Sequence, residues 1–344
     1  MTIECPTPHH EDEIVLLGHG AGGRLTAELL DSLILPSFGE TGGPLEDAAL
    51  LPGRPDLVMS TDSFVVSPLF FPGGDIGSLA VHGTVNDLAM RGAWPLALSV
   101  SLIVEEGLPL AELRAVTASL GKAAQEAGVP VVTGDTKVVG RGAADRLFVN
   151  TTGVGQRQAP LCPSAASARA GDAVLLSGPI GLHGTTVLST REGLGFESDI
   201  ASDSRPLHRL VRALAPLGAA VHVLRDPTRG GLAAALNEIA RDSSVAVEIE
   251  EYAVPVPEAV ASACDLLGLD PLVVANEGCL VAFVDPAVAG DALAAMRSMP
   301  EGAQATRIGE VVPDGPRGRV TLRTLVGARR IVDMPLGEQL PRIC

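Results

Sequence analysis

The sequence is poor in aromatic side chains and in positive charge. Its 344 residues include only seven Phe, one Tyr and one Trp, and 25 Lys and Arg stand against 41 Asp and Glu, for a net charge of −16. So few aromatic rings leave little for stacking bases, and the negative excess repels nucleic acid and anionic membranes. We therefore expect neither nucleic acid nor a membrane to be the main partner.

Paired cysteines and long apolar runs are missing as well. The five cysteines, an odd number with no CxxC pair, predict neither a disulfide framework nor a zinc site; they are Cys5, Cys162, Cys264, Cys279 and Cys344. Free thiols are typical of the reducing cytosol, so a cytoplasmic protein is expected. No uncharged apolar stretch reaches 18 residues, and no basic-then-apolar N-terminus appears, so neither a membrane span nor a signal peptide is expected.

What the sequence does contain is enough hydrophobic material, 46% of its residues, for two cores. Helical and strand periods mix in two successive series, with the Pro-rich and small-residue stretch 156–171 as the best linker candidate. This predicts an α+β (mixed αβ) protein of two domains. Its expected parts are a flexible N-terminal segment 1–13, an N-terminal domain 14–155, a C-terminal domain 165–334 and a flexible tail 335–344.

Several individual elements can be expected from their periods. Apolar spacing predicts helices at 24–34, 78–93, 110–128, 207–215 and 231–242. Strands are expected at 13–17, 96–104, 173–178 and 220–224, with 129–134 as a buried strand and 271–284 as a strand pair or one long bent strand.

The last ten residues, PLGEQLPRIC, place a thiol on a tether. Pro335 and Pro341 discourage helix, and no period is visible, so an arm rather than a packed element is expected. Ten extended residues span up to roughly 33 to 36 Å, which could carry a group on the sulfur of Cys344 between two active sites. A frayed residue without a role is the plainer interpretation, and both stay open at this point.

The motif GHGAGG at 18–23 satisfies the GxGxxG pattern between an expected strand and an expected helix. The pattern is weak evidence for a dinucleotide, because no second strand ending in an acid follows at the usual distance. Glycines still allow backbone N–H groups to approach a phosphate, which makes Gly20, Gly22 and Gly23 candidate phosphate contacts. A tight structural turn explains the same residues equally well.

Acidic residues recur in loops bounded by apolar strands. A single such residue is usually a helix cap or a turn residue. Several carboxylates brought together repel one another, so a group of them implies a cation, and hard oxygen ligands suit Mg²⁺ bridging to phosphate. The candidates are Asp47, Asp62, Asp87, Asp135 and Asp226, with Asn86 as a neutral oxygen ligand or hydrogen-bond donor.

Other charged residues near these motifs could take part in chemistry. Lys137 and Arg229 each follow one of the acids closely and could neutralise a transferring phosphoryl group, although lone cations are more often surface ion-pair partners. Glu277 lies in an apolar region where burial would raise its pKa and make it a proton acceptor, or it could pair with an Arg. His82 and His183 have no spaced metal-ligand partner, and we interpret them as structural or supporting residues.

Taken together, these strings resemble one family. The motifs are GHGAGG, STDSFVVSPLFFPGGDIG, NDLAMRGA, EEGLP, TGDTKVV, RDPTRGG, ANEG and the terminal PRIC, from about residue 14 to the end. They resemble the HypE family of nickel–iron hydrogenase maturation factors, within the superfamily of aminoimidazole ribonucleotide (AIR) synthetase and selenophosphate synthetase. LFFPGG and PRIC are more particular to HypE, whereas several of the others occur throughout the superfamily.

The resemblance implies a PurM-like fold in which two N-terminal domains build the β-barrel-like core of a homodimer, with ATP and Mg²⁺ in a cleft beside the C-terminal domain. The implied metal ligands are Asp47, Asp62, Asp87 and Asp226. The implied nucleotide contacts are Gly20, Gly22, Gly23, Asp62, Asn86, Asp135, Thr136, Lys137 and Arg229.

The family's chemistry implies that Cys344 receives a carbamoyl group from HypF. ATP-dependent dehydration then makes a thiocyanate, and the cyano group passes to iron on the HypC–HypD complex. Cys344, Lys137 and Glu277 are the implied catalytic residues, and whether Lys137 or Glu277 accepts the proton stays open. Two alternatives remain: a selenophosphate synthetase-like or thiamine-phosphate kinase-like enzyme acting on a free molecule, and a non-catalytic dimeric scaffold.

Overall fold

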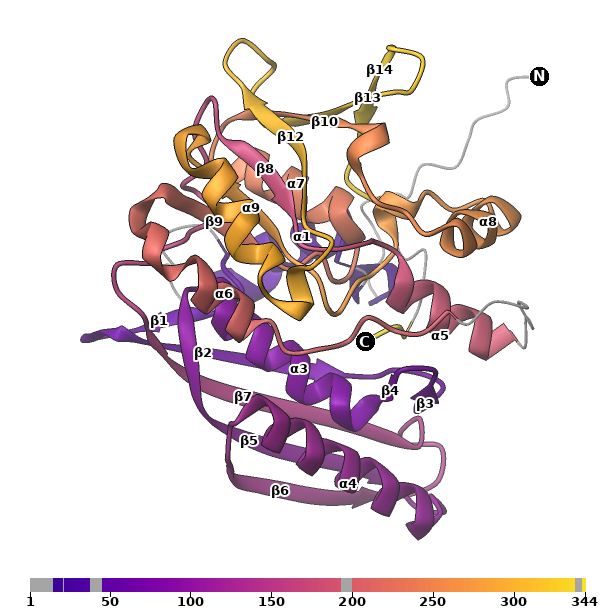
Figure 1. Cartoon of the computed structure of the whole chain (residues 1–344). Coiled ribbons are helices and arrows are strands. Elements are labelled where there is room, and N and C mark those ends of the chain that lie inside the picture. The colour runs from indigo at the N-terminus through magenta and orange to yellow at the C-terminus, as the bar shows by residue number, and fades with distance from the viewer. Residues whose placement is uncertain (1–14, 21, 38–44, 193–199, 338–341) are drawn as a thin grey trace, which may run out of the picture.

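Two β-sheets of different construction organise the chain, one in each half (Figure 1). The structure, a computed structural model, describes residues 15–20, 22–37, 45–192, 200–337 and 342–344. The first half forms a five-stranded sheet with helices on one face, and the second half forms a seven-stranded sheet with helices on both faces. This is the α+β architecture that the sequence predicts.

The N-terminal sheet has the strand order β1-β2-β7-β5-β6, and only the β5–β6 pair is parallel. Strand β7 alternates buried and half-buried residues, as expected for a sheet with one covered face. The strands are β1 (Ala49–Leu51), β2 (Arg54–Phe64), β5 (Ala93–Glu105), β6 (Val131–Val139) and β7 (Leu147–Arg157), and a small hairpin adds β3 (Phe70–Phe71) and β4 (Gly74–Asp75).

Helices α3 (Ile76–Met90) and α4 (Leu110–Ala127) lie on one face of this sheet (Figure 1). Helix α4 is amphipathic and ends at Gly128, whose φ of +72° suits glycine. Helix α3 is buried on nearly every side, because the C-terminal half packs against the face that the sheet leaves free. Functional side chains on α3 are therefore held between the two halves.

The C-terminal sheet has the order β14-β13-β10-β12-β8-β11-β9. Strand β8 reads AVLL without polar alternation because both of its faces are covered: Val174 and Leu176 pack toward α7, and Ala173 and Leu175 pack toward α6 and α9. The strands are β8 (Ala173–Leu176), β9 (Val221–Arg225), β10 (Ala246–Glu250), β11 (Val281–Val284), β12 (Thr306–Val312), β13 (Arg319–Arg323) and β14 (Arg329–Val332).

The remaining helices complete this half. Helix α7 (Gly231–Asp242) lies on one face of the sheet, while α6 (His208–Leu214) and α9 (Ala289–Arg297) lie on the other. Helices α5 (Leu182–Glu192) and α8 (Glu258–Leu267) flank the sheet (Figure 1). No helix in the part of the chain that the structure describes is long and apolar enough to cross a bilayer.

Most of the expected helices are present. The predicted helix 24–34 appears as α1 (Arg24–Leu29) and a π-helical turn (Leu30–Ile34), and it continues through α2 (Leu35–Ser37). It therefore extends three residues past the predicted end at residue 34. The predicted strand 13–17 is wrong within the described residues: Leu17–Gly20 is a 3-10 helix, and the Leu16 N–H bonds the His19 ring instead of a neighbouring strand.

Two other predictions also differ from the structure. The strand expected to be buried at 129–134 is β6, whose residues are almost all exposed. Among the described residues it is an edge strand that pairs only with β5. The expected strand 271–284 forms only its second part, β11. Its first part is a 3-10 turn at Pro271–Val273, capped by the Asp270 carboxylate, followed by a buried loop.

The stretch 156–171, predicted as a linker, is packed against both halves. Leu161, Ala165 and Ala168 are buried, and the backbone of Ala165 hydrogen-bonds the Glu46 carboxylate. The bounds of the four parts stay predictions, and the first part, 1–13, lies outside the described residues.

Candidate functional site

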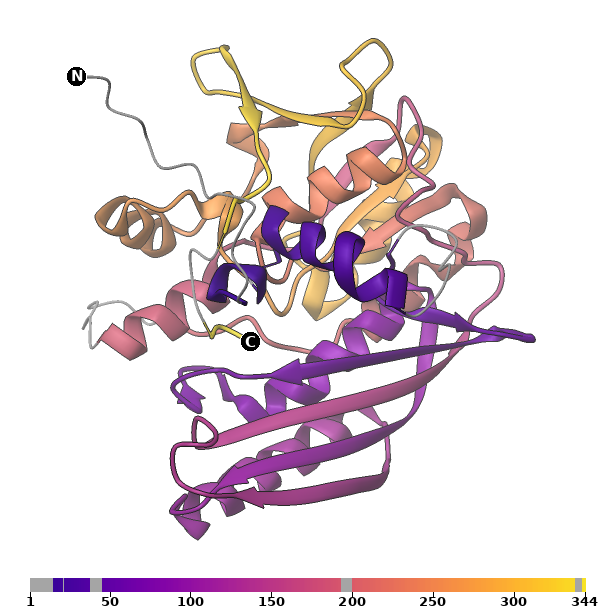
Figure 2. The same cartoon turned by 180° about the vertical axis from the view of Figure 1, so that it is seen from behind.

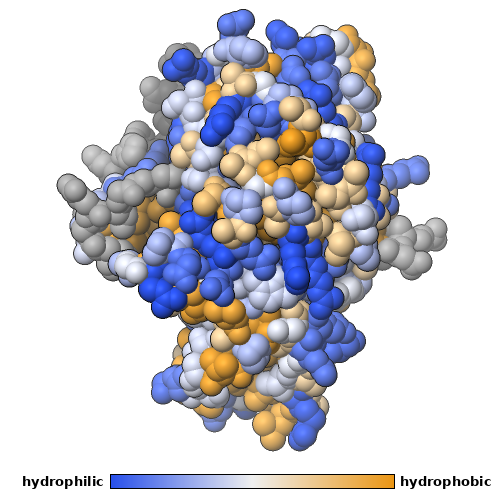
Figure 3. Space-filling view, turned by 60° about the vertical axis from the view of Figure 1, so that its left-hand side comes forward, coloured by the Kyte–Doolittle hydropathy of each residue, from blue (hydrophilic) through white to orange (hydrophobic). Residues whose placement is uncertain are grey.

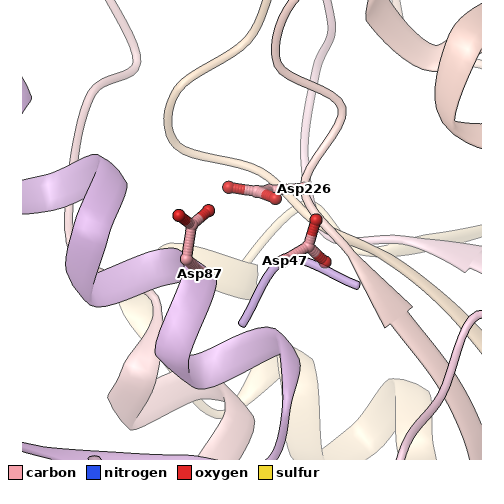
Figure 4. Close-up of side chains that lie close together, drawn as sticks. All are labelled: Asp47, Asp87 and Asp226. Atoms are coloured by element: carbon pink, nitrogen blue, oxygen red, sulfur yellow. The ribbon is translucent and has the colours of Figure 1, made fainter. Parts of the chain in front are cut away.

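Three carboxylates converge where the two halves meet. Asp47 precedes β1, Asp87 lies on α3 and Asp226 follows β9, and one oxygen of each lies within 4.8 Å of the others (Figure 4). Figure 4 shows their carboxylates turned toward one space. Residues far apart in sequence therefore form the oxygen-rich group that the scatter of acids predicted.

Burial and repulsion from neighbouring carboxylates raise the pKa of all three carboxyl groups. Burial is the largest cause in each case. The pKa of Asp47 rises to about 8 and that of Asp226 to about 6, while the pKa of Asp87 rises well above its usual value. A divalent cation would relieve this repulsion, and an all-oxygen donor set suits Mg²⁺. The residues therefore fit the metal that the sequence predicted.

Two ion-pair arrangements fix Asp47. The Arg225 guanidinium lies 3.0 Å from the Asp47 carboxylate and 2.6 Å from Glu238 on α7. The adjacent Glu46 lies 2.7 Å from Arg91, just past the end of α3. Arg225, which precedes Asp226 in RDPTRGG, was not among the predicted site residues. Its charge opposes the burial that raises the pKa of Asp47.

A second buried group surrounds the sulfur of Cys344. Its thiol is buried near Glu277. Burial raises the thiol pKa, the Arg229 guanidinium lowers it, and the Glu277 carboxyl group adds to the rise. Burial also raises the pKa of Glu277 well above its usual value, and Asp226 and Asp62 add to the shift. Asp62, on β2, has a raised pKa for the same reason, opposed by Arg229. Asp62 thus lies beside this group and outside the tight triad of acids.

The glycine loop closes one side of the site. Gly22 has a φ of +73°, and a Cβ there would come within 3.0 Å of Arg229, so only glycine fits this close approach. The Arg229 guanidinium donates to the Gly20 carbonyl oxygen at 3.2 Å. Gly22, Asp226, Thr228 and Arg229 help to line a cavity of about 160 Å³. This places Gly22 and the following Gly23 near the acids, although the segment before them is not the predicted strand.

The Asn86 side chain forms hydrogen bonds within the protein, which differs from its predicted role as a ligand. Its Nδ2 donates to the Arg205 carbonyl at 3.1 Å and to the Glu277 carbonyl at 3.4 Å, and its Oδ1 accepts from the Leu207 N–H at 2.7 Å. Both ends of the amide thus join α3 to the C-terminal half. Its contact with a nucleotide stays a prediction.

Asp135, Thr136 and Lys137 are not brought to this site within one copy of the chain. All three lie on the exposed edge strand β6, which is separated from Asp62 on β2 by the two strands β7 and β5, a spacing of about 14 Å. Lys137 and Asp135 form an ion pair at 3.2 Å with side chains 70% and 59% exposed. Strand order, which the sequence did not reveal, separates them from the other predicted residues.

The end of the chain is packed, where the sequence predicted an arm. Ile343 and Cys344 are buried in the core cluster of the first half, because apolar side chains from both halves form a pocket for them. His183 and Arg191 on α5 bond the backbone of this segment. His183 agrees with its interpretation as a supporting residue, whereas Arg191 was missed, since nothing in its local sequence distinguishes it.

Comparison with known families identifies both halves. The N-terminal domain of the AIR synthase related proteins matches residues 45–156, and the C-terminal domain of the same family matches residues 169–321. Together the two matches cover most of the chain.

Individual relatives are similar over almost their whole length. Carbamoyl dehydratase HypE of Cupriavidus necator is 54% identical over 95% of this chain and 94% of its own. Carbamoyl dehydratase HypE of Escherichia coli K12 is 45% identical over 96% of this chain and 99% of its own.

Solved structures agree. A crystal structure of hydrogenase maturation protein HypE in complex with ATP has a TM-score of 0.82 and 51% identity, covering 96% of this chain and all of that one. HypE in a HypE–HypF complex has a TM-score of 0.86 and 48% identity, covering 89% and 99%. A thiamine monophosphate kinase structure from Aquifex aeolicus, 19% identical with a TM-score of 0.64, shares the fold. The chain therefore belongs to the HypE family of AIR synthase related proteins.

Proposed function

We propose that this protein is an ATP-dependent carbamoyl dehydratase that converts a carbamoyl group on the sulfur of Cys344 to a cyano group, which becomes the cyanide ligand of hydrogenase iron. The observation that carries the proposal is the position of the sulfur. It lies buried against Glu277 and near Arg229 and Asp62, next to the triad of acids. The names and ATP complex of the relatives support the same reaction.

The chemistry requires activation of a poor leaving group. The oxygen of a thiocarbamate leaves slowly, but phosphoryl transfer from ATP onto that oxygen makes phosphate the leaving group. The C–O bond then breaks, both N–H protons are removed and a C≡N bond forms, so that ATP and S-carbamoyl-cysteine become ADP, phosphate and S-cyano-cysteine. The protein's task is therefore mainly positioning and charge stabilisation.

Side chains of this chain fit these tasks. Glu277 is buried, and its raised pKa makes its carboxylate a strong base for a nitrogen proton. Arg229 is near the sulfur and the glycine loop, where it can hold the charge of a phosphoryl group. Asp47, Asp87 and Asp226, with Asp62 beside them, would hold Mg²⁺, which when bound would stabilise the charge on the phosphates.

A homodimer would bring the residues of β6 into use. The face of the N-terminal sheet turned away from α3 and α4 is uncovered (Figure 2), and hydrophobic residues gather on the lower part of the molecule in Figure 3, where this domain lies. The exposed large apolar residues of the sheet are Leu50, Met59, Leu96, Ile103, Val131, Val132 and Val138. We infer that a second copy covers this surface and that Asp135, Thr136 and Lys137 serve its nucleotide site.

Other partners follow from the reaction. The sulfur must receive its carbamoyl group and later deliver the cyano group, so the buried segment must leave its pocket. HypF is the proposed donor, supported by a relative's structure with HypF, and the HypC–HypD complex is the proposed acceptor. Free thiols at Cys162, Cys264, Cys279 and Cys344 support action in the reducing cytosol.

The test follows the mass of the C-terminal peptide. With HypF, carbamoyl phosphate and ATP, the peptide should gain one carbamoyl group and then lose one water, and Cys344→Ser should show neither change. Cys162→Ser, which alters an exposed thiol, is the matched control and should behave as the wild type. A free-substrate kinase would instead keep its ATP turnover in Cys344→Ser, and a scaffold would show no carbamoyl gain or water loss in either protein.

A further inference from the structure

The backbone of the last described residues is held by donors from two separate parts of the fold. The Arg342 carbonyl oxygen accepts from the Ser67 N–H at 3.2 Å and from the Arg191 guanidinium at 2.8 Å. The Ile343 carbonyl oxygen accepts from Nε2 of His183 at 2.9 Å. Ser67 lies between β2 and β3, and the other two donors lie on α5. These three hydrogen bonds hold the main chain in place immediately before Cys344.

The hydrogen-bond chain behind His183 defines its tautomer. A carbonyl oxygen can only accept, so Nε2 carries the proton. Nδ1 lies 2.8 Å from the Ser202 hydroxyl, which itself accepts from the Ser204 N–H at 3.1 Å and so donates its proton to Nδ1. The Phe71 ring packs against the imidazole in a T-shaped arrangement, with the ring centroids 5.4 Å apart. The imidazole is therefore buried, neutral and fixed in one orientation.

Apolar packing complements these polar contacts. The Ile343 side chain is 2% exposed and belongs to the core cluster that contains Val187 of α5, Phe71 and Ala275. Ala275 lies two residues before Glu277, whose carboxyl group lies near the thiol. The pocket for Ile343 is thus built beside the group that meets the sulfur. If Ile343 were displaced in this pocket, the sulfur of the adjoining Cys344 would be displaced with it.

We propose that His183 is a positioning residue: by fixing the carbonyl of Ile343, it sets the place at which the Cys344 sulfur enters the buried site. Arg191 assists by holding the preceding carbonyl, so that α5 acts as the docking helix for the end of the chain. His183 does not touch the sulfur. The reason that this placement matters rests on the proposed function, but the docking itself does not.

Two substitutions of His183 distinguish the effect of losing the hydrogen bond to Ile343 from the effect of losing the imidazole ring. His183→Gln places an amide nitrogen where Nε2 stood and can still donate to Ile343. His183→Asn places its amide where Nδ1 stood, so it can keep Ser202 but cannot reach Ile343. The pair are close in size and polarity. A difference between them therefore reports the bond to the end of the chain.

The readout is alkylation of Cys344 by iodoacetamide in the full-length protein without nucleotide or partner. Cleavage after Glu338 releases the peptide 339–344 for mass spectrometry, and Cys162 serves as an internal reference. Loss of one buried hydrogen bond should raise the labelling rate of Cys344 about three- to tenfold in His183→Asn, with His183→Gln within about twofold of the wild type. Equal rates in all three proteins, or equal acceleration in both variants, would overturn the proposal.

A second variant keeps the test decisive if His183→Asn does not fold. Ile343→Ala removes the apolar anchor from the same segment, and the labelling rate of Cys344 should rise at least about tenfold. An unchanged rate in Ile343→Ala would contradict docking. Failure of the proposed function looks different: labelling would follow the expected order, yet the wild-type peptide would never lose water after carbamoylation.

Discussion

The buried junction between the two halves and the exposed edge strand β6 both carry residues predicted for one site, yet they differ in almost every physical respect. At the junction, Asp47, Asp87 and Asp226 are crowded and largely removed from water, and the pKa of each is raised. On β6, Asp135 is exposed, and its hydrogen bond with Lys137 lowers its pKa. The same residue type thus responds in opposite directions to burial and to a neighbouring cation.

The difference shows which of the predicted site residues come together within one copy of the chain. The junction has burial, converging acids and a thiol, whereas the β6 group has an ion pair in water that contributes little to stability. A solvent-exposed Lys137 gains catalytic influence only when another surface covers it. This contrast is the reason that our proposal assigns the junction to one copy and β6 to the contact with a second.

The largest effect should come from the junction. Glu277→Gln keeps the size of the side chain but removes the proton acceptor, so conversion of the carbamoylated peptide should slow by about 10² to 10⁴-fold. Loading by HypF should continue, because it takes place before the dehydration step. Quenched-flow mass spectrometry of the C-terminal peptide measures both steps. Glu250→Gln is the control. An equal fall in the conversion rate of that variant would contradict a catalytic role for Glu277.

Asp87→Asn should reduce ATP-dependent turnover by about a hundredfold, because one carboxylate of the proposed Mg²⁺ site is lost. In chelator, however, this variant should unfold at a temperature no lower than the wild type, since one of three crowded acids has become neutral. Thermal unfolding with and without Mg²⁺ checks both halves of the prediction. A large fall in stability without metal would show that Asp87 is structural.

Burial of the His82 ring at the junction should make the protein less stable in acid. His82 on α3 bonds Ser204, and burial lowers its pKa from 6.5 to about 4. Between these values the unfolded chain binds a proton that the folded chain does not, so stability falls as the pH drops below 6.5. From pH 6.5 to 5 this amounts to at most about 2 kcal/mol.

His82→Asn retains a donor near Ser204 and does not titrate. The stability difference between wild type and this variant, measured by urea unfolding at several pH values, should therefore shift against the wild type on acidification. Other titrating groups cancel in that difference. A difference independent of pH would contradict the lowered pKa of His82.

The smallest effect, and the sharpest test of the contrast, uses two inactive variants together. If Lys137 serves the second copy, mixing Lys137→Ala with Asp87→Asn should restore activity, because each mixed dimer has one site with both residues intact. Random pairing predicts about a quarter of wild-type activity, since half of the dimers are mixed and half of their sites are complete. Each variant taken alone through the same mixing procedure should regain no activity. Activity that stays at the background level would place Lys137 and Asp87 in the same chain's site or outside catalysis.

Several features of the site could be predicted because their causes are local. Asp47, Asp87 and Asp226 each adjoin an apolar strand or helix. Because such apolar segments are buried on folding, the adjoining acids are brought to the edge of the core. The helix 110–128 carries its own period and its own C-terminal glycine, and it appears as α4. By contrast, VPVV and PLVV look equally apolar, but the first lies on an exposed edge and the second enters a turn and a buried loop.

By itself the sequence determined the mixed αβ character, the family and the acids, glycines and cysteine that the chemistry needs, because these depend on residue type and short spacing. Only the tertiary structure decided that Arg225 pairs with Asp47, that Ile343 and Cys344 are packed inside, and that Lys137 lies apart. Those outcomes depend on strand order and on contacts between residues more than a hundred positions apart. No local pattern encodes such contacts, since they arise when the two halves close on each other.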